Sequence, residues 1–170
     1  GAIFTNDDAL AHKLRGIVNH GMYERYHHDV VCVNSRLDSI QAAVLNAKLP
    51  LLDQYGKARQ DAARKYSAAF EGHKNIIAPT ICDNCDCHVF HQYTLRIIEA
   101  NRDGLMQHLL DKGIPCAIYY PIPLHSQKAY LDVRYKEEDF PVTNQLVKEV
   151  ISLPMHTELD DEQIKFITDS

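Results

Sequence analysis

The 170-residue sequence contains no tryptophan, no long apolar run and no excess of basic residues. The formal net charge of -5 argues against a basic surface for nucleic acid. No stretch approaches the roughly 18 consecutive apolar residues that suggest a membrane helix. The amino terminus lacks a basic segment followed by an apolar one, so we expect no signal peptide. The 45% hydrophobic and 24% charged residues are ordinary for a soluble globular protein.

Cysteine is present in an odd number, five, whereas secreted disulfide frameworks usually hold an even number in a shorter chain. We therefore expect the reducing cytoplasm. Cys82, Cys85 and Cys87 are followed by His88 and His91, and zinc prefers thiolate and imidazole ligands. No second pair completes a known spacing, so we predict a reduced loop and no metal. A zinc-stabilised structural module is the alternative.

Breakers and caps divide the chain into short elements. Thr5 or Asn6 is placed to cap a first helix, Ser35 with Asp38 fits a capping box, and Pro50 should kink or divide the helix behind it. Seven prolines and seven glycines provide further boundaries. We expect strands over 2–5, 89–98, 115–120 and 151–154, a helix ending near Gly21, a helical connector over 35–71, and helices after Asn101, from Pro141 and after Asp160. This order predicts an α+β fold, a small antiparallel sheet with helices on one face.

The loop between the first two helices is rich in groups that bind anions. Residues 19–36 include Asn34, Arg36 and several imidazoles. A guanidinium gives paired hydrogen bonds to phosphate or carboxylate, and the helix start near Ser35 adds backbone N–H groups. The same loop could equally be a solvated connector.

Three further segments carry side chains that could line a ligand. The tyrosines and histidine of Tyr119–His125 follow an expected strand and are stiffened by prolines, which is typical of a ligand rim. Alternatively, both tyrosines pack on the sheet with their hydroxyls in water. We expect His91 and Tyr93, on one strand face, to be core residues. The segment 153–157 is expected only to end a strand.

Taken together, these segments resemble the DegT/StrS-type pyridoxal-phosphate-dependent sugar-nucleotide aminotransferases. The similar runs, in order, are NHGMYERYHHDVVCVNSRLDSIQAAVL, HQYTLR, IYYPIPLHSQKAY and ISLPMHTELDDEQI. The resemblance covers essentially the whole chain. HQYTLR and LPMHTEL further resemble members that aminate a 3-keto nucleotide-linked glucuronic acid derivative in surface-polysaccharide synthesis.

The resemblance implies the fold of the large type-I pyridoxal-phosphate enzymes. Residues 1–49 would be the tail of the large cofactor-binding domain and residues 50–170 the small carboxy-terminal domain. The family's Schiff-base lysine would lie upstream of Gly1. We therefore expect no catalytic residue within the chain, and no transamination by the chain alone.

By the same resemblance, the chain contributes binding residues across a homodimer. Asn34 would reach the cofactor phosphate of the partner subunit, Arg36 would meet anions of the substrate or cofactor, and Tyr120 would line the sugar-nucleotide site. Two positions depart from the family's pattern. Tyr119 stands where histidine is usual, and Cys32 stands where we expect a glycine, which matters if the backbone there needs a positive φ.

The implied reaction is a ping-pong transfer of an amino group from an amino acid, expected to be glutamate, to a keto-sugar nucleotide. A rival reading is a small α+β module that binds an anionic metabolite without catalysis.

Overall fold

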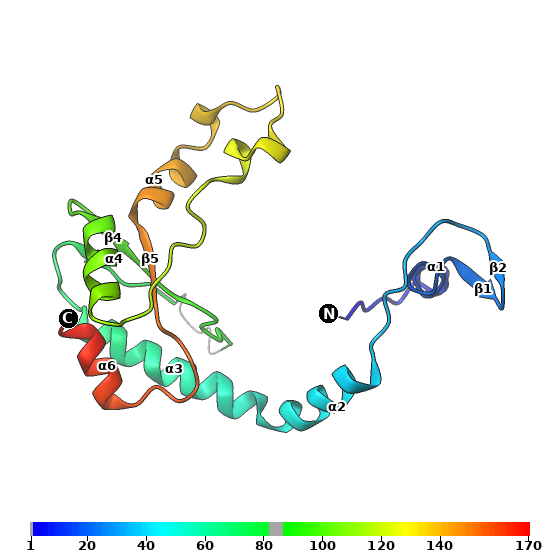
Figure 1. Ribbon diagram of the computed structural model, residues 1–170, viewed down its shortest axis with the longest axis horizontal. Helices are drawn as coiled ribbons and strands as arrows, with labels where there is room; N and C mark the ends of the chain where they lie inside the picture. The colour runs from blue at the N-terminus through cyan, green and yellow to red at the C-terminus, as the bar shows by residue number, and fades with distance from the viewer. Residues whose placement is uncertain (1, 82–86) are drawn as a thin grey trace. The chain divides into compact units, whose positions relative to one another are not determined.

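The computed structural model describes residues 2–81 and 87–170 (Figure 1). The chain divides into two compact units, Gly1–Leu51 and Leu52–Ser170, and each is described by itself.

The first unit begins with α1, Asp8–Val18. Its cap is Asp7, whose Oδ1 accepts two backbone N–H groups of the first turn at 2.9 and 3.0 Å. The expected cap at Thr5 or Asn6 was therefore wrong by one or two residues. The Asp7 carboxylate accepts both bonds directly, while the Thr5 hydroxyl accepts from the Asp7 N–H at 3.1 Å. Residues 2–5 form no strand.

A two-stranded hairpin of β1, Met22–Glu24, and β2, His27–His28, follows α1. Gly21 precedes it with φ +72°, and a Cβ built there would lie 1.9 Å from the Val30 carbonyl oxygen. Only glycine suits this position, because both the backbone conformation and the close approach exclude a side chain. The predicted end of the first helix near Gly21 is confirmed.

The expected helical connector is divided at Pro50, as predicted. It consists of α2, Ser39–Lys48, the 3-10 turn η1, Leu49–Leu51, and α3, Leu52–Ala69. Proline has no N–H to donate and clashes with the preceding turn, which accounts for the break.

The start of α2 differs from the prediction. Ser35 does not cap it, because the helix begins only at Ser39, while Ser35 lies beside α1 and its N–H donates to the Val18 carbonyl oxygen at 2.9 Å. The cap is Asp38, whose N–H donates to Oε1 of Gln41 at 3.1 Å. Asp38 therefore occupies the cap position that the sequence pattern assigned to Ser35.

The second unit contains a three-stranded antiparallel sheet in the order β3-β4-β5. The strands are β3, Ile76–Ile77, β4, Tyr93–Ile97, and β5, Val150–Leu153. The α+β prediction is confirmed. The two-residue β3 was not predicted, and the expected strand over 115–120 is reduced to a single bridge between Ala117 and Ser152.

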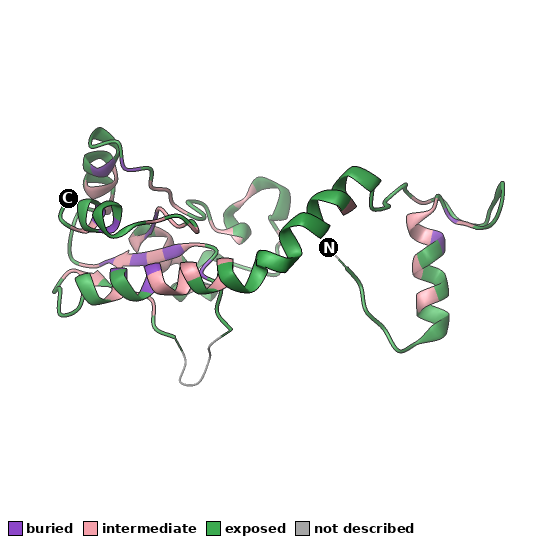
Figure 2. Ribbon diagram, turned by 90° about the horizontal axis from the view of Figure 1, so that it is seen from below, coloured by how far each residue is buried: buried purple, intermediate pink, exposed green. Residues whose placement is uncertain are grey.

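One face of this sheet forms the core. Alternate residues of β4 are buried there, and Tyr93 pairs with Leu153 while Leu95 pairs with Ile151. The helices α3, α4 (Arg102–Asp111) and α6 (Asp161–Thr168) supply most of the rest of the buried cluster, and Phe90 and Ile114 complete it from outside these elements (Figure 2). The expected arrangement with helices on one face is therefore confirmed.

The long segment 121–140 contains three short 3-10 turns before α5, Pro141–Glu149. These turns are η2, Leu124–Ser126, η3, Lys128–Tyr130, and η4, Glu137–Asp139. The segment leaves the sheet and returns through α5 (Figure 1, yellow to orange). The ring of His125 stacks on Phe140 with centroids 4.3 Å apart, which joins the two ends of the segment.

The predicted caps of the second unit are confirmed. Asn101 Oδ1 accepts from the Gly104 N–H at 2.9 Å, and Asp160 Oδ1 accepts from the Gln163 N–H at 2.8 Å. Pro141 occupies the first turn of α5, where its missing N–H costs nothing. No helix that the structure describes combines the length and apolar character needed to cross a membrane.

Candidate functional site

In the first unit, the chain holds Asn34 against the end of α1. Asn34 forms a bridge with Asn19, and on either side the His20 N–H donates to Val33 O at 3.0 Å and the Ser35 N–H to Val18 O at 2.9 Å. The loop returns to α1 through main-chain bonds. The Asn34 side chain is therefore carried on ordered backbone.

Arg36 and Asn34 form a pair on this surface. Arg36 Nε donates to Asn34 Oδ1 at 2.8 Å, and both residues are exposed. With its oxygen engaged, the Asn34 amide presents its Nδ2 donors beside the remaining guanidinium N–H groups. This set of donors suits a phosphate or a carboxylate.

Cys32 does not disturb this loop. Among the described residues, a positive φ at non-glycine positions occurs at His20, Tyr26, Phe90 and Glu99. Residue 32 is not in that conformation, so a cysteine is accommodated without backbone strain.

In the second unit, Tyr119 and Tyr120 follow the bridge that joins Ala117 to Ser152 at the edge of β5. Tyr120 is 75% exposed, and its ring lies edge-on to that of Tyr119 with centroids 5.9 Å apart. Asn34 and Arg36 belong to the first unit, so the structure brings those two together and describes Tyr120 separately.

A cleft of about 340 Å³ lies beside Tyr119. Its walls come from three segments that are distant in sequence, and they include His91, Gln92, Tyr119, Met155 and His156. The interpretation of 153–157 as a mere strand end was therefore incomplete. His91 is exposed and lies on the cleft, so its assignment to the core was wrong, because the chain bends at 91–92 before β4 begins.

The ring of His156 is oriented by its own loop. The Glu158 N–H donates to His156 Nδ1 at 3.2 Å. The Glu158 carboxylate lies 3.7 Å from the same nitrogen, beyond hydrogen-bond reach. Nδ1 therefore acts as an acceptor, and the neutral ring carries its proton on Nε2.

Two buried tyrosines form hydrogen bonds close to the segments that line the cleft. The Tyr66 hydroxyl donates to the Pro154 carbonyl oxygen at 3.1 Å, and the Tyr93 hydroxyl bonds Ser67 Oγ at 2.9 Å. Burial and the neighbouring Tyr93 raise the pKa of Tyr66, and burial raises the pKa of Tyr93 despite its bond to Ser67. Both phenols are therefore neutral, and their hydrogen bonds tie α3 to the strands. The prediction that Tyr93 is a core residue is confirmed.

Sequence reasoning missed two residues of the cleft, Gln92 and Cys116. Gln92 gave no signal, because the chain bends at 91–92 and the alternation of β4 begins only at Tyr93. Cys116 gave no signal. Burial raises its thiol pKa, and Sγ lies 3.7 Å from the Met106 carbonyl oxygen.

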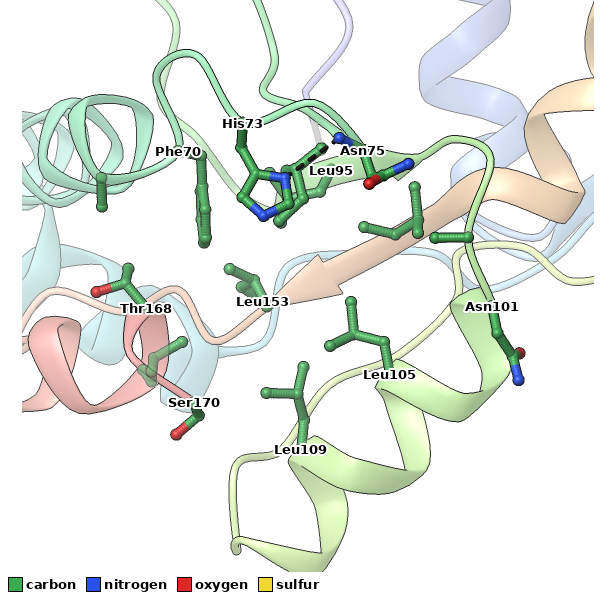
Figure 3. Close-up of a pocket in the computed structure, with 15 residues that line it drawn as sticks. Phe70, His73, Asn75, Leu95, Asn101, Leu105, Leu109, Leu153, Thr168 and Ser170 are labelled. Atoms are coloured by element: carbon green, nitrogen blue, oxygen red, sulfur yellow. Dashed lines mark hydrogen bonds between the residues drawn. The ribbon is translucent and has the colours of Figure 1, made fainter.

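A second cavity of about 390 Å³ lies among the helices of the same unit (Figure 3). Phe70, Leu105, Leu109 and Leu153 line it, and the Asn75 N–H donates to His73 Nδ1 at 3.2 Å at its rim (Figure 3). Its largely aliphatic lining continues the core, and its polar members are His73, Asn75, Asn101, Thr168 and Ser170.

The cysteine-rich segment is only partly described. Cys82 and Cys85 lie outside the described residues, so the predicted absence of a metal there stays a prediction. His88 Nδ1 accepts the Phe90 N–H at 3.1 Å. That nitrogen is already used in the local turn.

Comparisons with known proteins agree with this arrangement. The family model described as the DegT/DnrJ/EryC1/StrS aminotransferase family matches residues 1–170. The chain is 43% identical over 167 residues to the UDP-2-acetamido-2-deoxy-3-oxo-D-glucuronate aminotransferase of Pseudomonas aeruginosa, covering 98% of the chain and 45% of that protein. It is 41% identical to the pleiotropic regulatory protein of Geobacillus stearothermophilus, covering 99% of the chain and 45% of that protein.

Solved structures show the same similarity. The crystal structure of a DegT DnrJ EryC1 StrS aminotransferase from Brucella abortus matches with a TM-score of 0.87 and 36% sequence identity. The match covers 98% of this chain and 43% of the Brucella chain. The chain thus spans about half the length of the relatives it matches. With the model matched along its whole length, the chain belongs to the DegT/DnrJ/EryC1/StrS aminotransferase family.

Proposed function

We propose that the intact protein is a pyridoxal-phosphate-dependent aminotransferase that moves an amino group from an amino acid, glutamate, to a 3-keto sugar of a UDP-sugar. The observation that carries the proposal is the donor pair Asn34–Arg36 in a chain that matches the aminotransferase family throughout. Two relatives are named for 3-oxo or 3-dehydro UDP-sugars, at 43% and 42% identity. The proposed setting is surface-polysaccharide synthesis in the cytoplasm.

The chain's own residues bind and orient in this proposal. The cofactor supplies the electron sink and carries the amino group when bound. The lysine that holds the cofactor comes from another part of the intact protein. No residue of this chain is assigned a catalytic role.

Asn34 is proposed to bind the cofactor phosphate of a partner subunit. Its Nδ2 donors and the adjacent guanidinium have the chemistry that a phosphate requires, and the bond to Arg36 fixes the amide's orientation. Arg36 is proposed to meet the anionic groups of substrate or cofactor. Tyr120, exposed beside Tyr119, is proposed to line the sugar-nucleotide site.

A homodimer is supported by apolar surface on α2. No residue of α2 is buried, and Ile40 is 81% exposed. Val44 and Leu45 are also exposed on this short helix. Apolar side chains on so exposed a helix are expected to be covered by another domain or by a second copy.

One observation favours a second candidate function. A relative at 41% identity is named a pleiotropic regulatory protein. The alternative is a protein that binds an anionic metabolite through the same loops and does not catalyse a reaction.

The test is a transamination assay on the full-length protein with glutamate and a UDP-3-keto sugar. Formation of 2-oxoglutarate and an amino sugar in equal amounts supports the proposal. Tight binding of the nucleotide sugar without cofactor, and without turnover when cofactor is added, supports the metabolite-binding alternative.

A further inference from the structure

We propose that the cleft bounded by Gln92, Tyr119 and His156 binds an uncharged, hydrogen-bonding ring of the nucleotide sugar, either its hexose or its nucleobase, and thereby selects the substrate. The inference rests on the proposed function, because it assigns one part of that substrate to one surface.

The lack of charged side chains in the cleft argues against binding of the charged parts of the two substrates. Among the described residues that line it there is no lysine, arginine, aspartate or glutamate. A diphosphate or the two carboxylates of glutamate would meet no permanent positive charge there, only the imidazoles of His91 and His156, which is costly in a partly desolvated site. A neutral ring carries no such cost.

The polar side chains of the cleft match the edge of such a ring. The Gln92 amide offers both a donor and an acceptor, and the Tyr119 hydroxyl can act as either. His156 offers a donor, because the Glu158 N–H occupies Nδ1 at 3.2 Å and leaves the proton on Nε2. An acetamido hexose and a pyrimidine base both present donors and acceptors at their edges.

The apolar wall of the cleft suits the face of such a ring. Pro115, Pro154 and Met155 line the cleft together with Tyr119, and apolar surface with a few placed polar groups is typical of small-molecule sites. The volume of about 340 Å³ falls at the small end of such sites, which fits one ring.

The cleft is continuous with the proposed sugar-nucleotide site. Tyr119 lines the cleft, and its ring contacts that of Tyr120 with centroids 5.9 Å apart. A substrate that contacts Tyr120 would therefore lie next to a residue of the cleft, Tyr119.

Two variants and two matched controls test this assignment in the full-length protein loaded with pyridoxal phosphate. Gln92→Ala removes the amide, and Gln107→Ala removes an exposed amide on α4 that bonds Asp111. His156→Phe removes the imidazole but keeps a ring. His73→Phe is its control, because His73 Nδ1 also accepts a backbone N–H at 3.2 Å, outside the cleft.

Calorimetric titration with UDP-N-acetylglucosamine should show about tenfold weaker binding for each cleft variant, about 1.4 kcal/mol, and less than twofold change for each control. A parallel titration with UDP distinguishes the two sources of the ring. An equal loss with UDP indicates the nucleobase, and an unchanged UDP affinity indicates the hexose.

Binding by both cleft variants that equals their controls would overturn the assignment while leaving the proposed function intact. Failure of the unmodified protein to bind either nucleotide would overturn both. Circular dichroism melting identifies a variant that does not fold, and the other variant then decides alone.

Discussion

Arg36 donates through Nε to Oδ1 of Asn34 at 2.8 Å, so the amide of Asn34 is oriented by the residue two positions after it. The remaining N–H groups of the guanidinium and the Nδ2 donors of Asn34 are therefore close together. An anion bound by one residue is close to the other, and the two should not act independently.

Asn34→Ala in the full-length protein should weaken cofactor binding roughly ten- to a hundredfold, since a charge-assisted hydrogen bond to phosphate contributes about 1.5–3 kcal/mol. Asn34→Asp should weaken it further. The aspartate keeps an acceptor for Arg36 but places a negative charge beside the phosphate. Absorbance titration with pyridoxal phosphate measures both, with Asn46→Ala as control. Unchanged affinity in Asn34→Ala would refute the assigned role.

Tyr66→Phe should lower the melting temperature of the full-length protein. The substitution leaves the Pro154 carbonyl oxygen without its donor, and a lost buried hydrogen bond costs about 1 kcal/mol. Differential scanning calorimetry checks this. Tyr55→Phe, in the less buried first half of the same helix, is the control, and equal melting temperatures for the two variants would contradict the prediction.

Stability should also fall as the pH rises above about 10, the ordinary pKa of tyrosine. The pKa values of Tyr66 and Tyr93 are raised in the folded state, so above pH 10 the unfolded chain releases protons that the folded one retains. The stability that these phenols contribute is complete below that pH and is lost as the pH rises toward their folded pKa values. Denaturant melts between pH 8 and 11 should show this slope, and Tyr66→Phe should make it shallower. Identical slopes in the two proteins would disprove the link.

Asp160→Ala should destabilise α6 by about 1 kcal/mol, because Oδ1 accepts the Gln163 N–H at 2.8 Å and the Gln163 side chain accepts the Asp160 N–H at 3.1 Å. Thermal unfolding followed by circular dichroism measures the loss. Glu162→Ala, an exposed acid in the same turn, should cost only a few tenths of a kcal/mol. The prediction fails if the two substitutions have equal effects.

Much of this fold could be predicted from local signals. Asn101 and Asp160 cap helices because their short side chains accept the backbone N–H of the residue three positions later. Pro50 divides a helix because a proline inside a helix lacks an N–H donor and clashes with the preceding turn. Each of these effects acts within one turn of helix. The α+β class followed from the order of such elements.

The errors arose where distant segments decide the outcome. The run 115–120 has strand-like composition, but only Ala117 pairs with Ser152, which the chain reaches much later. Ser35 would cap a helix on pattern alone, yet the main-chain bond from its N–H to Val18 holds it beside α1, and α2 begins only at Ser39. Gln92 and His156 are brought to one cleft by the β4–β5 pairing, and no local pattern contains that information.

The bond from Tyr66 to Pro154 has a consequence for how variants of this protein should be interpreted. Pro154 is two residues before His156, so a change at Tyr66, in the core, loosens the backbone that carries His156. Such a change would be recorded in a genetic screen as a loss of substrate selection, although Tyr66 lies outside the set of residues that line the cleft. A screen that assigns function from phenotype alone would therefore count Tyr66, a buried residue, among the residues that contact the substrate.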